Sequence, residues 1–231
     1  QKETTQTCGE IKDIKFNNVS FTYPNTDVEI FKNLNFEIKK GDKIGIFGPS
    51  GIGKSTLFRL LLRFYDPNFG TISFNHIDLK DLSFNEIYQR IGMLEQETYL
   101  FDDTIFNNIA IAKEGASLDE VKKAAEKAGI ANLIDTLPEG YNTEMGQMAS
   151  RLSGGEKQRI GIARIMLACP DIIVMDEPTS ALDVFHEKEL LHTLKTEYSD
   201  ATWLIISHRM STLTCCNRLY KLENGQLIQI N

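Results

Sequence analysis

The sequence predicts an α/β domain in which strands alternate with helices around a largely parallel sheet. Two continuous apolar runs, 172–175 and 203–206, are typical of strands buried on both faces of such a sheet, and a helix is expected between them at 185–198. Nearer the start of the chain, 14–23 and 30–38 loosely alternate apolar and polar residues. That alternation predicts an antiparallel β subdomain with one buried face.

Composition narrows the class of protein. A chain of 231 residues fits one large domain, or one domain with an inserted subdomain. Its 42% hydrophobic and 25% charged residues are typical of soluble globular proteins, and no apolar run approaches the length of a membrane span. The net charge of −7 argues against nucleic acid as a partner, because nucleic-acid surfaces are normally basic. The four cysteines form no C-x-x-C pair, which favours a reduced compartment.

The remaining elements are predicted from turn and cap signals. Ser83 and Ser117 are each followed three residues later by glutamate, the capping-box spacing at a helix start, and Asn224-Gly225 predicts a hairpin turn. Short strands are expected at 43–47, 71–74, 91–94, 218–222 and 226–230, and a further helix at 156–169.

The first motif lies between a predicted strand and a predicted helix. Residues 48–56 read Gly-Pro-Ser-Gly-Ile-Gly-Lys-Ser-Thr, the spacing of a phosphate-binding loop. Its glycines let backbone N–H groups surround an anion, Lys54 would reach the β- and γ-phosphates, and Ser55 would ligate Mg²⁺. A glycine-rich turn that binds nothing is the alternative. We expect a nucleoside triphosphate site formed by Gly48, Pro49, Ser50, Gly51, Ile52, Gly53, Lys54, Ser55 and Thr56.

The second motif ends a predicted buried strand. Asp176 and Glu177 follow the apolar run 172–175, at the edge where open α/β sheets place their ligands. Asp176 fits the carboxylate that orients Mg²⁺ in phosphate-loop ATPases. Glu177 fits a general base for the attacking water.

The third motif, Leu152-Ser153-Gly154-Gly155-Glu156, is a second glycine-rich helix start that could bind an anion. With all three motifs in place, the chain resembles the nucleotide-binding domain of ATP-binding cassette (ABC) transporters from Ile11 to Asn231. The resemblance implies a phosphate-loop NTPase (RecA-like) core at 10–96 and 164–231, an inserted helical signature subdomain at 97–163, and a tail or linker at 1–9.

The resemblance also implies roles for single residues. Tyr23 resembles the aromatic that stacks on adenine, although a core tyrosine of a strand is the alternative. Gln96 resembles the glutamine that contacts Mg²⁺ and water, and His208 the histidine that senses the γ-phosphate. Asp183 marks the loop at the dimer interface. In the family two such domains enclose two ATP molecules head to tail, so that the signature residues Ser153, Gly154 and Gly155 of one domain would serve the nucleotide of the other.

Two segments, 96–105 and 141–146, are similar to those of the exporter branch. In that branch the domain is soluble, lies at the cytoplasmic face, and forms the C-terminal part of a chain whose N-terminal part spans the membrane. ATP hydrolysis would then power export. Two departures concern the coupling to that membrane part: Glu95 stands where proline is usual, and Gln147-Met148-Ala149 where Glu-Arg-Gly is usual.

Three other classes of protein compete with this interpretation. An importer-type cassette subunit is disfavoured by the exporter-like segments. A soluble cassette ATPase that acts on DNA or ribosomes is disfavoured because only about a hundred residues, with no sustained heptads, separate Lys54 from Ser153. An unrelated phosphate-loop kinase or GTPase would not need the second glycine-rich site. A homodimer is favoured over a heterodimer, and the transported substrate is not predicted.

Overall fold

The computed structural model describes residues 7–146, 152–180, 182 and 184–230. They form two compact units, each with its own internal contacts: 1–92, 170–177 and 200–231 make the first, and 93–169 with 178–199 the second. The second unit contains all of the helical subdomain expected at 97–163. Among the helices that the structure describes, none is both long and apolar enough to cross a membrane.

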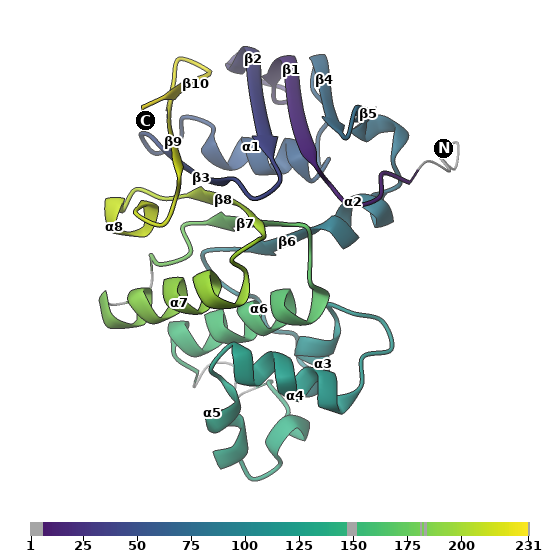
Figure 1. The fold of residues 1–231 in the computed structure, drawn as a ribbon, viewed down its shortest axis with the longest axis vertical. Helices are drawn as coiled ribbons and strands as arrows, with labels where there is room; N and C mark the ends of the chain where they lie inside the picture. Colours follow the sequence, from purple (N-terminus) through teal and green to yellow (C-terminus); the bar gives the residue numbers. More distant parts are fainter. Residues whose placement is uncertain (1–6, 147–151, 181, 183, 231) are drawn as a thin grey trace. The chain divides into compact units, whose positions relative to one another are not determined.

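The first unit contains a four-stranded antiparallel sheet in the order β2-β1-β4-β5 (Figure 1). Phe16 lies opposite Phe36 and Phe21 opposite Phe31, so that aromatic side chains fill its buried face. The predicted antiparallel subdomain is thereby confirmed. Its strands are β1 (Asp13–Thr22), β2 (Glu29–Lys39), β4 (Phe69–Phe74) and β5 (Ile77–Asp78).

A second sheet of six strands has the order β10-β9-β3-β8-β7-β6. The strands β9, β3, β8 and β7 run parallel, and the antiparallel hairpin to β10 turns at Asn224 and Gly225, whose φ angles are 50° and 73°. The predicted α/β core with a mainly parallel sheet is confirmed. The strands are β3 (Lys43–Phe47), β6 (Ile91–Leu94), β7 (Ile172–Asp176), β8 (Thr202–Ile206), β9 (Arg218–Glu223) and β10 (Gln226–Gln229).

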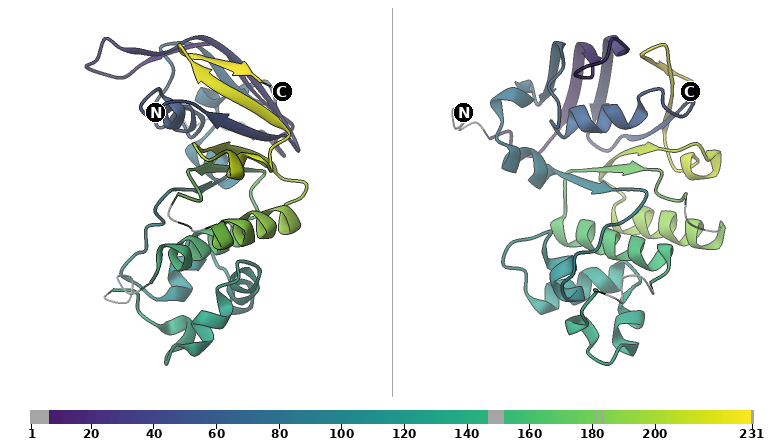
Figure 2. Two further views of the ribbon diagram at one scale, coloured as in Figure 1. Left: turned by 90° about the vertical axis from the view of Figure 1, so that its left-hand side faces the viewer. Right: turned by 180° about the vertical axis from the view of Figure 1, so that it is seen from behind.

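Helix α1 (Lys54–Leu61) lies between the two sheets of the first unit (Figures 1 and 2). Five of its eight residues are buried, which a helix covered on one face only would not need. The remaining helical elements of this unit are η1 (Leu79–Asp81), α2 (Phe84–Arg90) and α8 (Met210–Leu213).

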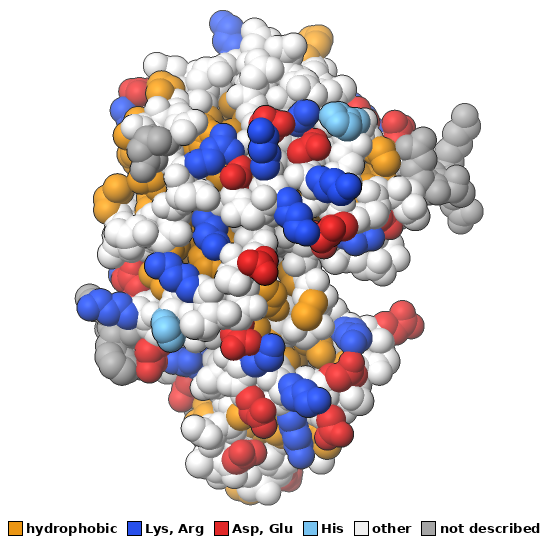
Figure 3. Space-filling view, viewed as in Figure 1, with side chains coloured by type: hydrophobic (Ala, Val, Ile, Leu, Met, Phe, Trp, Pro, Cys, Tyr) orange, Lys and Arg blue, Asp and Glu red, His pale blue; other side chains and the backbone are white. Residues whose placement is uncertain are grey.

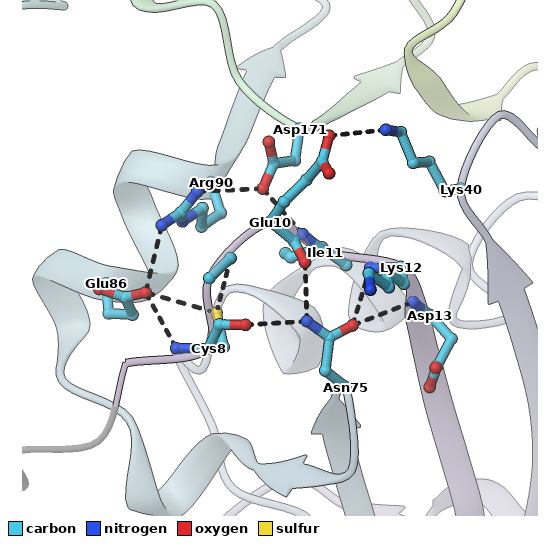
Figure 4. A network of polar contacts seen from close by, with 11 residues as sticks. Cys8, Glu10, Ile11, Lys12, Asp13, Lys40, Asn75, Glu86, Arg90 and Asp171 are labelled. Atoms are coloured by element: carbon cyan, nitrogen blue, oxygen red, sulfur yellow. Dashed lines mark hydrogen bonds and ion pairs between the residues drawn. The ribbon is translucent and has the colours of Figure 1, made fainter.

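The first described residues of the chain are held against this unit by a polar network (Figure 4). The Asn75 amide accepts from the N–H of Lys12 at 2.7 Å and donates to the carbonyl of Cys8 at 2.9 Å. Glu86 accepts from the N–H and the thiol of Cys8, and also pairs with Arg90. The capping box predicted at Ser83 is therefore only half formed: Ser83 caps α2, but the Glu86 carboxylate is engaged elsewhere.

The second unit is helical. Helices α3 and α4 pack on α6, and α7 lies beside α6, where Tyr198 just after α7 donates to the carbonyl of Ile165 at 2.8 Å. Ser117 and Glu120 form the complete capping box that the spacing predicts. The helices are α3 (Ile105–Ala110), α4 (Leu118–Lys127), α5 (Ala131–Thr136), η2 (Gly140–Asn142), α6 (Gly154–Ala168) and α7 (Val184–Glu197).

Candidate functional site

The loop 48–53 connects β3 to the start of α1 and is built to surround an anion. Gly53, the N-cap of α1, has φ 109°, and a Cβ there would lie 2.3 Å from Cγ2 of Ile30, so only glycine fits. Gly51 has φ 78° for the same turn. No side chain caps α1, which leaves its first N–H groups and the positive end of its dipole open to a ligand.

Lys54 and Ser55, at the start of α1, each make a polar contact through the side chain. The Lys54 ammonium donates to the carbonyls of Gly48 at 2.8 Å and Pro49 at 2.9 Å, which leaves one of its three N–H groups for a phosphate oxygen. The Ser55 hydroxyl donates to Oδ2 of Asp176 at 2.7 Å. A hydroxyl and a carboxylate oxygen already in contact are the hard oxygen donors that Mg²⁺ prefers, so these residues fit that ion.

Glu177 follows β7 in a backbone conformation that its side chain does not favour. Its φ is 49°, a left-handed value uncommon outside glycine, and its N–H donates to the Ile206 carbonyl at 2.9 Å. Oε2 of Glu177 lies 2.8 Å from Nδ1 of His208 and accepts weaker bonds from the His208 N–H and the Ser207 hydroxyl. Within the described residues, Oε1 accepts no hydrogen bond. The carboxylate is thus oriented by one oxygen and available at the other.

Tyr23 follows β1 in an aromatic cluster. Its ring meets those of Phe21 and Tyr65 edge to face, with centroids 4.9 and 5.1 Å away, and the Arg59 guanidinium lies 5.9 Å from its centroid. Its hydroxyl lies 2.9 Å from Oγ1 of Thr56. Tyr23 therefore borders the phosphate loop through Thr56, and its stacking on adenine stays a prediction.

The other predicted site residues belong to the helical unit. Ser153 caps α6 in a complete capping box with Glu156, and a Cβ at Gly155 would lie 3.3 Å from Leu182. Gln96 is exposed in the segment after β6. Asp183 and the departure at Gln147, Met148 and Ala149 lie outside the described residues.

Sequence reasoning missed a buried polar centre in the helical unit. The Asn108 side chain is fully buried and donates to the carbonyls of Phe101, Asp103 and Thr104. The Arg164 guanidinium, which protrudes from α6, donates to the Asn108 carbonyl at 2.6 Å. The position of Arg164 was the available signal for its burial. Ile160, four residues before it, and Leu167, three residues after it, are buried on the same face of the helix.

The surface charge is mixed. On the face drawn in Figure 3, lysine and arginine side chains are interspersed with aspartate and glutamate among the residues drawn in colour. A nucleic-acid surface would present one basic stripe. The face in view lacks such a stripe.

Comparison with known proteins places this geometry in a family. A match to the ABC transporter family covers residues 31–180. The chain is 43% identical over 216 residues to "ATM1-type heavy metal exporter" of Novosphingobium aromaticivorans, a match that covers 94% of this chain and 35% of that protein. It is 40% identical over 218 residues to "Probable ABC transporter ATP-binding/permease protein" of Haemophilus influenzae, with 94% and 39% covered.

A solved structure, "Structure of a bacterial Atm1-family ABC exporter with ATP bound", superposes with a TM-score of 0.91 at 40% identity and covers 99% of this chain and 40% of that one. Fold and motifs together define an ATPase domain of the phosphate-loop class. The chain belongs to the ABC transporter family and corresponds to the nucleotide-binding domain of its exporters, as the three motifs and the segments 96–105 and 141–146 predicted. It spans 35% to 39% of the length of the two relatives named above.

Proposed function

We propose that this domain binds Mg²⁺-ATP at the loop 48–56 and hydrolyses the bond to the γ-phosphoryl group. The observation that carries the proposal is the pairing of two contacts in the first unit: Ser55 with Asp176, and His208 with Glu177. The first provides oxygen ligands for the metal ion, and the second fixes a carboxylate beside the phosphate loop. Binding of nucleotide alone would not need the second contact.

The reaction is attack of water on the γ-phosphorus. Glu177 accepts a proton from the water at its free oxygen Oε1, the water oxygen bonds to phosphorus, and the bond from phosphorus to the β–γ bridging oxygen breaks with its electron pair leaving on ADP. Lys54 and the N–H groups of the loop stabilise the negative charge that develops. When bound, Mg²⁺ would add charge neutralisation at the phosphates, held by Ser55, Asp176 and the predicted ligand Gln96.

We infer that a second copy of the domain completes the site. Ser153, Gly154 and Gly155 form the start of α6, a second helix N-terminus suited to phosphate, although one nucleotide already has the start of α1. Head-to-tail pairing gives both starts a ligand. Tyr23 would stack on adenine, His208 would contact the γ-phosphate, and Asp183 would lie at the interface.

The remainder of the transporter is proposed from the relatives. Their names describe an exporter and an ATP-binding/permease protein, and each is more than twice as long as this chain. We propose that this domain lies at the cytoplasmic face of a membrane and drives a transmembrane domain that exports a substrate. The departures at Glu95 and Gln147–Ala149 would bear on coupling to that domain.

The test is ATPase rate against protein concentration, with Mg²⁺, for the wild type and Glu177→Gln. The glutamine keeps the shape but cannot take the proton, so turnover is expected to fall by about a hundredfold or more while ATP still binds. Specific activity of the wild type should rise with concentration because the site needs two copies.

The control is Glu223→Gln, which removes an exposed ion pair with Lys221 in the same unit and should change turnover little. Near-normal turnover in Glu177→Gln would refute the assignment of the base. Specific activity that stays flat, in a protein that sedimentation shows to be monomeric, would refute the composite site.

A further inference from the structure

A small cavity of about 210 Å³ lies within the helical unit, between the segment after β6 and the helix α6. Four of its lining residues have polar side-chain groups: Glu95, Thr98, Tyr99 and Arg164. Both the segment and the helix bear proposed site residues, Gln96 and Ser153. A group that fills this cavity would therefore contact both the segment after β6 and helix α6, and would hold them together.

Arg164 brings a positive charge to the cavity with no negative partner among the described residues. Its guanidinium donates three hydrogen bonds within that part of the chain, all to neutral acceptors: the carbonyl of Asn108, the carbonyl of Tyr99 at 2.9 Å, and Oδ1 of Asn108 at 3.1 Å. Burial lowers the pKa of the Arg164 guanidinium. A guanidinium has five N–H groups, so two remain for a further acceptor.

Thr98 provides a second unused donor. Its Oγ1 is buried and has no hydrogen-bond partner among the described residues, an arrangement that costs free energy in a protein interior. A Cβ at Gly161 of α6 would lie 2.8 Å from this oxygen, which places the hydroxyl tightly against the helix. The guanidinium of Arg164, with its unused donors at the cavity, is suited to bind a carboxylate.

Glu95 is the one acidic side chain among the described residues that line the cavity. Its side chain is exposed, and it makes no hydrogen bond or ion pair with any described residue. It directly precedes Gln96. Because Glu95 lines the cavity, its carboxylate is the described acidic group best placed to enter it.

We propose that Glu95 is a positioning residue whose carboxylate enters this cavity and pairs with Arg164 when nucleotide binds, fixing Gln96 against helix α6. The inference rests on the proposed function, since it needs nucleotide binding at 48–56. In this pairing the partly buried Arg164 guanidinium gains a counter-charge. Glu95, at the position where proline is usual, then orders the segment that contains Gln96.

Hydrogen–deuterium exchange tests the pairing directly. The 231-residue chain is measured with and without Mg²⁺ and a non-hydrolysable ATP analogue, as the wild type, as Glu95→Gln, and as Glu97→Gln. Glu97 is the matched control because it is exposed in the same segment but does not line the cavity. Nucleotide is expected to slow exchange at 95–99 by about threefold or more in the wild type and in Glu97→Gln, and much less in Glu95→Gln.

Protection of 48–56 separates the two proposals. If 48–56 is protected in all three proteins while 95–99 behaves alike in the wild type and Glu95→Gln, the role of Glu95 is refuted and the proposed function stands. If 48–56 gains no protection in any of them, nucleotide binding is refuted and the inference falls with it.

Kinetics provides a readout that a purely structural role would not give. Because Glu95 acts through Gln96 rather than on the nucleotide, Glu95→Gln is expected to lower kcat by about threefold or more with KM for ATP nearly unchanged. Lysine lacks the planar guanidinium that can bind a carboxylate through two N–H groups. In an Arg164→Lys background, Glu95→Gln should therefore lower kcat clearly less. Additive effects of the two changes, or a change in KM alone, would contradict the pairing.

Discussion

The two helix starts assigned to phosphate differ in how their backbone N–H groups are used. Helix α1 begins after Gly53 with no side-chain cap. Helix α6 begins after Ser153, which accepts from the N–H of Glu156 at 3.3 Å, while the Glu156 carboxylate accepts from the N–H of Ser153 at 2.7 Å and from its hydroxyl at 2.9 Å. No side chain accepts a hydrogen bond from the start of α1, whereas the capping box of α6 uses the N–H groups of Ser153 and Glu156.

This difference assigns different tasks to the two starts. An anion at α1 gains hydrogen bonds without losing any, so affinity for nucleotide should depend on the first unit alone. An anion at α6 would compete with the Glu156 carboxylate for the Ser153 hydroxyl, so we expect contact there to be weaker than at α1. Mutations at the two starts should therefore separate binding from turnover.

The largest expected effect is at the open start. Gly53→Ala places a Cβ in contact with Ile30 and forces alanine to a left-handed φ, which costs about 1–2 kcal/mol before any clash. We expect the Kd for Mg²⁺-ATP, measured by titration with a fluorescent analogue, to rise about tenfold or more.

The control for this change is Gly115→Ala, in the other unit. Gly115 has φ 70°, but a Cβ added there would have no described atom within 4 Å beyond its chain neighbours. The change should lower thermal stability through backbone strain and leave the Kd unaltered. Equal loss of affinity in both variants would show that the effect is global and not local to the open start.

A smaller effect is expected at the satisfied start. Ser153→Ala removes the cap of α6 and should cost about 1 kcal/mol, a fall in Tm of roughly 2–4 °C for a chain of this size. Ser117→Ala removes an almost identical box from α4, with the same three distances within 0.1 Å, and should cost a similar amount.

Turnover distinguishes the two serines. Ser153→Ala should lower kcat by about tenfold with the Kd for ATP little changed, since the hydroxyl is proposed to meet the nucleotide of a second copy. Ser117→Ala should leave kcat as it was. A loss of kcat shared by both serine variants would mean that helix stability, and not the signature contact, limits the reaction.

The smallest effect concerns the reference box in α4 and its pH range. The Lys113 ammonium and the Ser117 N–H and hydroxyl hold the pKa of Glu120 at about 2, below its ordinary 4.5. Because the folded pKa is the lower one, this stabilisation is complete above pH 4.5 and is lost as the pH falls through 2. The Tm advantage of the wild type over Glu120→Gln should thus be present at about pH 7 and vanish near pH 2. An advantage that persists at the acidic end would contradict the charge-based account.

Much of the fold could be predicted because strands that are buried on both faces of a sheet consist of continuous apolar runs. β7 and β8 were predicted within one residue at each end. The loop 48–56 was predicted from the spacing of its glycines, and the structure shows that Gly53 is needed there for its positive φ and its closeness to Ile30. The hairpin was predicted from the Asn224-Gly225 pair, since both residues readily adopt the positive φ that the turn requires. These are local requirements, which a sequence can reveal.

Long-range polar contacts could not be predicted. The box at Ser83 is incomplete because Glu86 binds Cys8, 78 residues away, a partner that no local spacing indicates. Arg164 likewise bonds to Asn108, 56 positions away, and no spacing within its own helix indicates that partner. Such contacts depend on which elements pack together, which spacing rules within one segment do not address.

The left-handed backbone at Glu177 has a consequence for engineering. Glycine adopts φ 49° without the Cβ penalty, so the backbone conformation alone favours glycine at 177, by about 1 kcal/mol. A thermostabilisation campaign scored by melting temperature would then select the loss of the carboxylate assigned to the water. Heat resistance and turnover compete at this single residue, and position 177 should be held fixed when the domain is redesigned.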